Sequence, residues 1–253
     1  MIHVAVHADP LSEGAIRRMQ HWITRCNEKD ADCKVQDPAL PTPLLDIDNP
    51  QLIKLCNADS LTDGQRSPYI ALSHCWGLPN KTFLTTRNTI AEMRAGFPIG
   101  DAPATFRNAI QVTRCLGIRY LWIDALCIIQ HVDEDWKLEA SRMGSVYANS
   151  FLTIAAANAK DDNDGFLCPR TDVLTSLKIM SSTGRSAQIY LQTQGNGTNV
   201  HAYNTTQPLD TRGWVLQERF LPRSTLEFGS TQMSWECQCF SLHESGTDSY
   251  NGI

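Results

Sequence analysis

Glu139 is a candidate catalytic carboxylate because of its place on a helix that the sequence predicts over about residues 135 to 148. It lies three residues after Trp136 and shares a face with the apolar residues of the next two turns. A carboxylate that points toward a protein core is costly unless it is paired, hydrogen-bonded or facing a cavity. Functional carboxylates with altered pKa values occur in such environments. The alternative is a carboxylate at the edge of the apolar face that reaches solvent or pairs with Arg142 or Lys137.

A second group of candidates lies where two apolar strands are expected to end. Asp124 ends one of them, and the turn from Ser73 to Gly77, which contains Trp76, ends the other. In open α/β sheets, ligands bind beyond the carboxyl ends of the strands. If the two strands are parallel neighbours, Ser73, Trp76 and Asp124 meet the helix of Glu139 at one edge of the sheet. For Asp124, a structural role in capping the following turn is the alternative.

Polar and aromatic residues are dense on a short helix expected near residues 212 to 220. This segment contains Arg212, Trp214, Glu218 and Arg219. Its charges can form structural ion pairs against the sheet, or Arg212 and Arg219 can meet an anionic ligand. The sequence alone favours the structural ion pairs.

Four of the nine cysteines fall into two small groups that are candidate metal ligands. Cys237 and Cys239 lie near His243, and Cys26 lies near Cys33. Neither group has the C-x-x-C spacing that recurs in structural zinc sites, and the two groups would need to meet in space. We therefore expect buried thiols in a reducing, cytoplasmic compartment and no metal.

Composition excludes several other classes of protein. Hydrophobic residues make up 42% of the chain and charged residues 19%, which is typical of a globular domain rather than a disordered chain. The net charge of -5 and the absence of a basic stripe argue against a nucleic-acid partner. No apolar run is long enough to span a membrane. No P-loop, Rossmann glycine loop or G-x-S-x-G motif is present, which disfavours kinase, GTPase and α/β-hydrolase chemistry.

The elements that must position these candidates alternate between strand and helix. The expected order is strand, helix, strand, helix and strand, over residues 69–73, about 103–116, 118–129, about 135–148 and 151–157. This order implies right-handed parallel crossovers. After Leu174 the pattern changes to segments of period two separated by turn residues. We expect an α/β fold with a parallel sheet core flanked by helices and antiparallel hairpins added in the C-terminal half.

The same patterns predict the domain layout. Residues 1–66 carry a helix at about residues 10–27 and a Pro-rich lead-in, both packed on the main domain. Residues 67–253 form that domain, with an α/β core over 67–157 and a β-rich extension over 158–253. The polar ending suggests a fragment of a longer protein.

Five blocks of the chain carry a resemblance to a known family: the lead-in LPTPLLDID, the block YIALSHCWG, the long central blocks TFRNAIQVTRCLGIRYLWIDALCIIQ and DWKLEASRMGSVYANSFLTIAAA, and the closing block RGWVLQERFLPRSTLEFGSTQMSWEC. In sequence and in order they resemble the fungal heterokaryon incompatibility (HET) domain. The match covers most of residues 40–240. Family members often carry a His between two cysteines near the start, where this chain has Asp30 between Cys26 and Cys33. The resemblance implies a cytoplasmic protein of non-self recognition that triggers programmed cell death when incompatible genotypes fuse.

HET domains are in turn similar to TIR domains, which have a flavodoxin-like parallel sheet and in some branches cleave NAD. The TIR catalytic glutamate follows a tryptophan by three residues, as Glu139 follows Trp136 here. The resemblance therefore implies an NAD⁺ glycohydrolase that acts as a homo-oligomer, with NAD⁺ as substrate and no cofactor. Glu139 would be catalytic, and Ser73, Trp76, Gly77, Asp124, Trp136, Arg212 and Trp214 would bind the substrate.

Two alternatives are non-enzymatic. One is a signalling module that self-associates and recruits partners, and the other is a recognition domain for an allelic or upstream partner protein. The first predicts a shallow surface where the enzyme needs a pocket, and the second predicts tight binding without loss of nucleotide.

Overall fold

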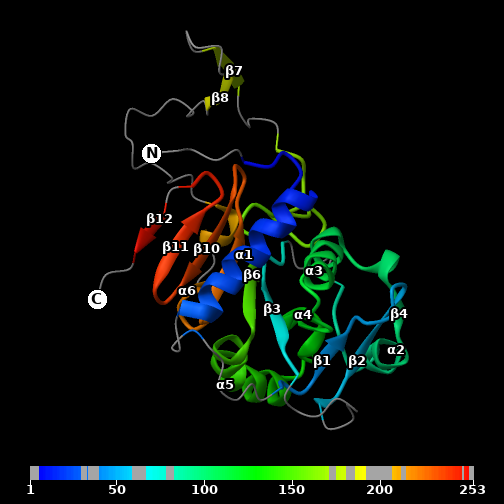
Figure 1. Cartoon of the computed structure of the whole chain (residues 1–253). Helices are drawn as coiled ribbons and strands as arrows, with labels where there is room; N and C mark the ends of the chain where they lie inside the picture. Colours follow the sequence, from blue (N-terminus) through cyan, green and yellow to red (C-terminus); the bar gives the residue numbers. More distant parts are fainter. Residues whose placement is uncertain are drawn as a thin grey trace.

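The computed structural model is built around one mixed sheet of ten strands (Figure 1). It describes residues 6–29, 33, 40–58, 67–77, 83–170, 175–180, 186–191, 207–211, 215–246 and 248–250. The strand order is β12-β11-β10-β9-β6-β3-β5-β1-β2-β4. The expected α/β class, with a parallel core and antiparallel additions, is confirmed.

Four neighbouring strands form the parallel core. They are β3 (Tyr69–Ser73), β5 (Tyr120–Trp122), β6 (Leu152–Ala155) and β9 (Ser224–Phe228). β3 pairs in parallel with β5 on one side and β6 on the other, and β6 pairs in parallel with β9. Across the sheet from β5 to β9, these strands are therefore the second, first, third and fourth of the core in the chain, which is the flavodoxin-like order. The connection that follows β3 leads to β5 on one side, whereas β6 lies on the other side of β3, so the chain changes direction across the sheet between β3 and β6.

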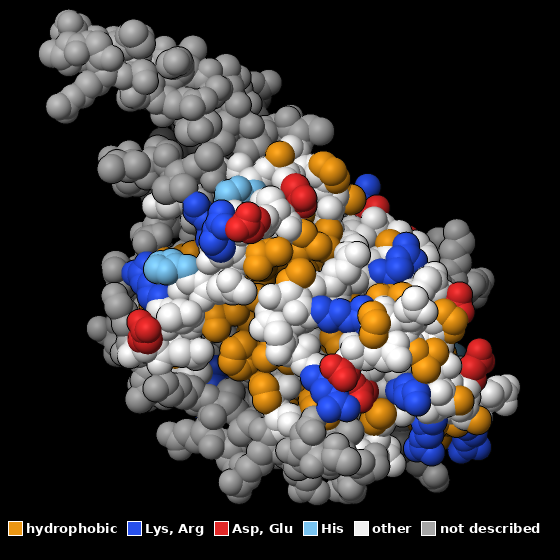
Figure 2. All heavy atoms as spheres, turned by 45° about the vertical axis from the view of Figure 1, so that its right-hand side comes forward, with side chains coloured by type: hydrophobic (Ala, Val, Ile, Leu, Met, Phe, Trp, Pro, Cys, Tyr) orange, Lys and Arg blue, Asp and Glu red, His pale blue; other side chains and the backbone are white. Residues whose placement is uncertain are grey.

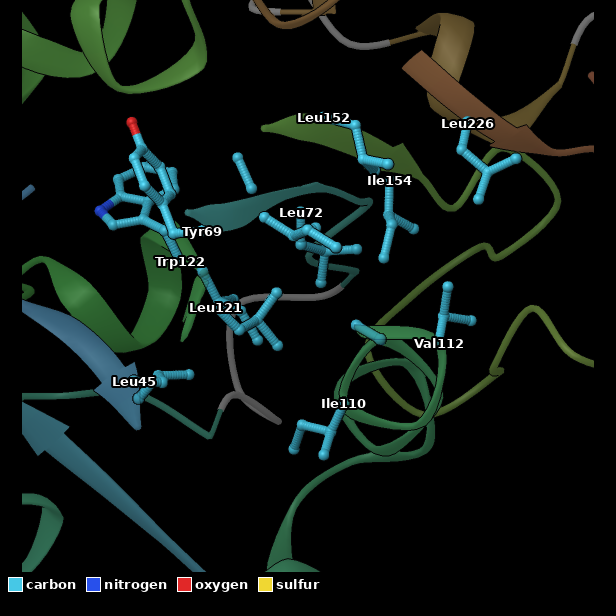
Figure 3. Packing of buried hydrophobic residues seen from close by; sticks show 14 of the residues in the cluster. Leu45, Tyr69, Leu72, Ile110, Val112, Leu121, Trp122, Leu152, Ile154 and Leu226 are labelled. Carbon is cyan, nitrogen blue, oxygen red and sulfur yellow. The ribbon is translucent and has the colours of Figure 1, made fainter. Parts of the chain in front are cut away.

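Helices cover both faces of this core. α3 (Ala104–Cys115) buries Ile110 and Val112, which point toward Leu72, Leu121 and Ile154 of the sheet (Figure 3). α5 (Asp133–Asn149) covers the opposite face, because the Tyr69 hydroxyl donates a 2.6 Å hydrogen bond to the Val146 carbonyl. The Trp122 and Tyr147 rings also pack edge to face, 5.7 Å apart, on that side. Alternate residues of β3 thus face different helices.

The N-terminal lead-in contributes strands as well as a helix. β1 (Leu44–Asp46) pairs antiparallel with β5, and β2 (Leu52–Cys56) pairs antiparallel with β1. β4 (Phe97–Pro98) closes this edge, next to α2 (Ile90–Ala95) and the 3-10 turn η3 (Ile99–Asp101). The expected N-terminal helix is α1 (Glu13–Lys29), which buries Ala15, Met19 and Trp22 in the common core. The lead-in was expected only to pack on the main domain, whereas part of it forms strands of the sheet itself.

The other edge of the sheet is antiparallel. β10 (Met233–Cys237), β11 (Phe240–His243) and β12 (Asp248–Tyr250) follow β9 as successive hairpins. α6 (Val215–Phe220) and the 3-10 turn η4 (Pro208–Thr211) precede β9. β7 (Thr175–Met180) and β8 (Ser186–Leu191) pair with each other as a separate two-stranded sheet. The period-two segments after residue 174 are therefore strands, as predicted, but β9 also pairs in parallel with β6 and so belongs to the core as well as to a hairpin.

The apolar stretch of residues 118–129 is only partly a strand. β5 ends at Trp122, and Asp124–Cys127 form the short helix α4. The Asp124 carboxylate accepts a 2.7 Å hydrogen bond from the Ala125 backbone N–H at the start of this turn. All four residues of α4 are buried, and a buried helix is as apolar as a buried strand. The prediction of one continuous strand was wrong for this reason.

A buried ion pair ties the start of the described chain to its end. The Arg170 guanidinium contacts the Glu244 carboxylate at 2.6 Å, and the two side chains are 5% and 0% exposed. The same carboxylate accepts hydrogen bonds from the backbone N–H groups of His7 (2.7 Å) and Met233 (3.0 Å). Glu244 therefore joins three segments that are far apart in sequence.

The surface carries mixed charge. On the face shown in Figure 2, acidic and basic side chains are interspersed among hydrophobic ones. Among the helices that the structure describes, none is both long and apolar enough to cross a membrane.

Candidate functional site

The carboxyl ends of β3 and β5 are joined by a tryptophan and an aspartate. The Trp76 indole N–H donates a 2.8 Å hydrogen bond to one oxygen of the Asp124 carboxylate. The other oxygen accepts from the Ala125 N–H, so Asp124 also caps α4 as the structural alternative predicted. The expected contact between the ends of these strands is observed for Trp76 and Asp124, because β3 and β5 are parallel neighbours.

A buried histidine lies behind this pair, and sequence reasoning missed its role. His74 Nε2 lies 3.0 Å from an Asp162 oxygen, and Nδ1 lies 3.8 Å from an Asp124 oxygen. The imidazole is stacked near Trp76, with ring centroids 6.5 Å apart, and meets the Phe106 ring edge to face at 5.1 Å. His74 is fully buried, so it faces Asp162 and Asp124 from inside the fold and is not accessible to a substrate. Its position directly after a buried strand was the only available signal.

Gly77 allows the loop that carries Asp162 to approach the end of β3. Its φ is +78°, a region that side-chain-bearing residues rarely adopt. A Cβ at this position would also lie 2.4 Å from the Cβ of Asp161. Gly77 is therefore required by the packing of this edge.

Ser73 faces the opposite side of the sheet from His74. Its hydroxyl donates a hydrogen bond to the carboxylate of Glu218 on α6, and both side chains are buried. The two residues line a cavity of about 20 Å³ at the β3–β6 divergence, together with Thr225 and Glu227 of β9. A volume of this size holds about one water molecule. The divergence point, where ligands often bind in such folds, is therefore filled by side chains.

Glu139 lies in the wall of a larger and separate cavity. The cavity has a volume of about 300 Å³, and its lining includes Leu40, Thr42, Tyr69 and Asn149. Glu139 is buried, as its place on the apolar face of α5 predicted. Arg142 donates a 3.1 Å hydrogen bond to the Glu139 carboxylate and is itself 55% exposed, which places it at the mouth of the cavity.

The expected meeting of all four candidates at one edge is therefore only partly observed. Trp76 and Asp124 are in contact, and Ser73 lies on the adjacent strand end. None of these three residues lines the cavity of Glu139. That cavity instead uses Tyr69, at the amino end of β3, and residues of the lead-in before β1.

Comparison with known proteins identifies the family. A family model described as Heterokaryon incompatibility protein (HET) matches residues 69–218. This range runs from the start of β3 into α6 and covers more than half of the chain. The chain belongs to the heterokaryon incompatibility family. Membership supports a role in fungal heterokaryon incompatibility. Searches of curated proteins and of solved structures found no match.

All eight predicted site residues lie within the matched part of the HET domain. Trp136 belongs to α5, but its side chain is outside the part that the structure describes, and Arg212 and Trp214 lie outside it altogether. Arg219, on the same short segment, is placed among three carboxylates at 3.5 to 3.8 Å, those of Asp210, Glu227 and Glu236. Arg219 thus forms the structural ion pairs that the sequence favoured.

Glu227, beside the small cavity of the HET domain, gives a testable pH dependence. Burial raises the pKa of Glu227 above its usual range, and this effect outweighs the opposing ion pair with Arg219. A raised pKa in the folded state means that ionisation of Glu227 destabilises the fold as pH rises through that pKa. Glu227→Gln is therefore expected to raise the urea midpoint at about pH 7.5 but not at or below about pH 4, near the unfolded pKa of glutamate.

The matched control is Glu236→Gln, because Glu236 contacts the same arginine at 3.7 Å but is 49% exposed. We expect this control to show no stabilisation at either pH. An equal gain for both variants, or a gain for Glu227→Gln at low pH, would contradict the assignment.

Proposed function

We propose that this HET domain is a cytoplasmic cell-death effector that hydrolyses the N-glycosidic bond of NAD⁺, with Glu139 as the catalytic residue. One observation supports this more than any other: a buried carboxylate forms part of the wall of a cavity of about 300 Å³. Small-molecule sites start at about this volume. The spacing of Trp136 and Glu139 at the start of α5 adds the resemblance to TIR domains.

The reaction needs few protein groups. The nicotinamide leaving group is positively charged in NAD⁺, so the C1′–N bond breaks with its electron pair going to the ring nitrogen and no general acid is required. The ribose becomes oxocarbenium-like, and an adjacent carboxylate stabilises that positive charge. Water then adds at C1′ and loses a proton, which yields ADP-ribose and nicotinamide. Glu139 supplies the carboxylate in this scheme.

The cavity offers further groups of suitable chemistry. The Tyr69 ring contributes an apolar wall, although its hydroxyl is engaged by the Val146 carbonyl. Arg142 at the mouth carries a guanidinium, which suits a diphosphate. The nicotinamide ribose would occupy the cavity, and the remaining half of NAD⁺ would extend past Arg142 into solvent. The binding roles of Ser73, Trp76 and Asp124 stay predictions, because those residues line neither this space nor its mouth.

The test is release of nicotinamide from NAD⁺ by the purified protein over a wide range of protein concentration. If activity requires a homo-oligomer, the rate per chain is expected to rise with concentration before reaching a plateau. Light scattering on the same samples identifies the species present at each concentration. A folded protein that releases no nicotinamide at any concentration would rule out the hydrolase.

A non-enzymatic, self-associating signalling module is the second candidate, and one surface feature favours it. Phe220 at the end of α6 is 75% exposed, and its neighbour Leu221 is 39% exposed. Adjacent exposed apolar side chains that form a contiguous patch can mark a protein contact surface. This candidate predicts association without nicotinamide release, and association that Phe220→Ser weakens.

A further inference from the structure

The two cysteine groups of the sequence meet in space. The Sγ atoms of Cys26, Cys33 and Cys237 all lie within 4.8 Å of one another. Cys239 joins the group through a 3.9 Å contact between its Sγ and that of Cys33. Cys26 belongs to α1 and Cys237 ends β10, so this cluster unites the N-terminal helix with the last hairpins of the sheet. The expectation of no metal rested on the missing C-x-x-C spacing and on the separation of the two groups in the sequence, and the fold brings these groups together.

The distances suit a tetrahedral ion. Four thiolates bound to Zn²⁺ at about 2.3 Å have sulfur–sulfur separations of about 3.8 Å. The Cys33–Cys239 separation of 3.9 Å already agrees with this value. The sulfurs of Cys26, Cys33 and Cys237 lie within 4.8 Å of one another and need to approach by about an ångström at most. Among the described residues, the nine cysteines form no disulfide. The sulfurs are thus close enough to share a metal.

A cation lies near the cluster. The Arg25 guanidinium lies 4.9 Å from the centre of the Phe240 ring, and Phe240 begins β11, directly after Cys239. A site of four thiolates around Zn²⁺ carries a net charge of -2, which this guanidinium helps to offset.

We propose that Cys26, Cys33, Cys237 and Cys239 together bind one Zn²⁺ ion in a closed, structural site. Thiolate ligands select soft metals, and four sulfurs in tetrahedral arrangement favour zinc among the common ones. Three of the four cysteines are buried and Cys239 is half-buried, which leaves no open position for a reacting water. The ion fastens α1 to the β10–β11 hairpin. None of the four ligands lies in the range of the HET family match, so the site is independent of Glu139 and of the proposed hydrolase.

The first experiment measures metal in the intact protein purified without chelators. Elemental analysis is expected to find about one zinc per chain. Exchange of zinc for Co²⁺ is expected to produce the intense thiolate charge-transfer band and the visible spectrum of a tetrahedral four-sulfur site. Cobalt that binds with an octahedral, sulfur-free spectrum would overturn the proposal, as would metal-free protein whose thiols are reduced or joined in disulfides.

Serine variants of the cysteines test which residues bind the zinc ion. Cys26→Ser and Cys237→Ser are expected to lower the zinc content at least about tenfold, and chelation is expected to lower the Tm of the wild-type protein. The matched control is Cys168→Ser, because Cys168 is exposed and lies outside the cluster. Full zinc content in Cys237→Ser, or equal loss in Cys168→Ser, would contradict the assignment. If the ligand variants do not fold, the cobalt spectrum of the wild-type protein still decides.

Discussion

Replacement of Glu139 by glutamine is expected to slow nicotinamide release by about 10²–10³-fold, the usual cost of losing one group that stabilises transition-state charge. Glutamine keeps the shape of the side chain and can still accept the hydrogen bond from Arg142, which lies 3.1 Å away. It lacks the negative charge that stabilises the oxocarbenium-like ribose. The loss should therefore appear in kcat rather than in KM. Initial rates from chromatographic separation of nicotinamide, with urea unfolding of both proteins, measure the effect.

Glu92→Gln is the control for this prediction. Glu92 is a glutamate in the first turn of α2, is exposed, and lies outside the cavity lining. Its replacement should leave the rate within about twofold of wild type, since surface changes away from a site have small effects. Wild-type release by a folded Glu139→Gln protein would remove Glu139 from the mechanism. If Asp124→Asn then abolished release, the reacting centre would lie at the carboxyl edge of β3 and β5 instead.

Arg170→Met is expected to lower the free energy of unfolding by about 3–5 kcal/mol, because it leaves a buried carboxylate without its cation. The Glu244 side chain is 0% exposed and contacts the Arg170 guanidinium at 2.6 Å. The N–H groups of His7 and Met233 still donate to that carboxylate, so a value near 3 kcal/mol is more consistent with the structure than one near 5. Urea unfolding followed by circular dichroism measures the change, with the m-value checked for constancy.

Two further variants make this measurement specific. Arg17→Met breaks an exposed pair with Glu13, whose partners are 65% and 84% exposed, and should cost no more than about 1 kcal/mol. Adding Glu244→Gln to Arg170→Met replaces the stranded charge with a neutral amide and should recover part of the lost stability. If Arg170→Met costs less than the Arg17 control, the ion pair does not hold the two ends of the described chain together.

The local sequence pattern determined the position of several core helices and strands. The strand predicted at 69–73 has those bounds in β3, and the helix predicted at about 103–116 is α3, Ala104–Cys115. Both depend on periodicity and on end signals such as Pro103 and Gly117, which act within a few residues. The buried side of α5, and with it the burial of Glu139, followed from the same periodicity. These features need no knowledge of distant contacts.

Contacts between side chains that are far apart in the sequence could not be predicted from local periodicity. Asp162 faces His74 because the loop after β6 returns to the end of β3, and Glu218 reaches Ser73 from α6, 145 residues away in sequence. Within the apolar stretch of residues 118–129, Asp124 was a local sign that the strand ends, but nothing local showed that Asp124–Cys127 form the helix α4. Burial on all sides removes the periodicity that separates a strand from a helix.

The sequence by itself determined the family, the alternation of strand and helix over residues 69–157 and a buried glutamate on α5. Only the tertiary structure decided what that glutamate faces, because its cavity combines α5 with Tyr69 and the lead-in before β1. Only the tertiary structure joined Cys33 to Cys239, 206 residues apart. Side-chain periodicity is a local property of the backbone, whereas a cavity or a metal site requires segments that approach each other only when the whole sheet is packed.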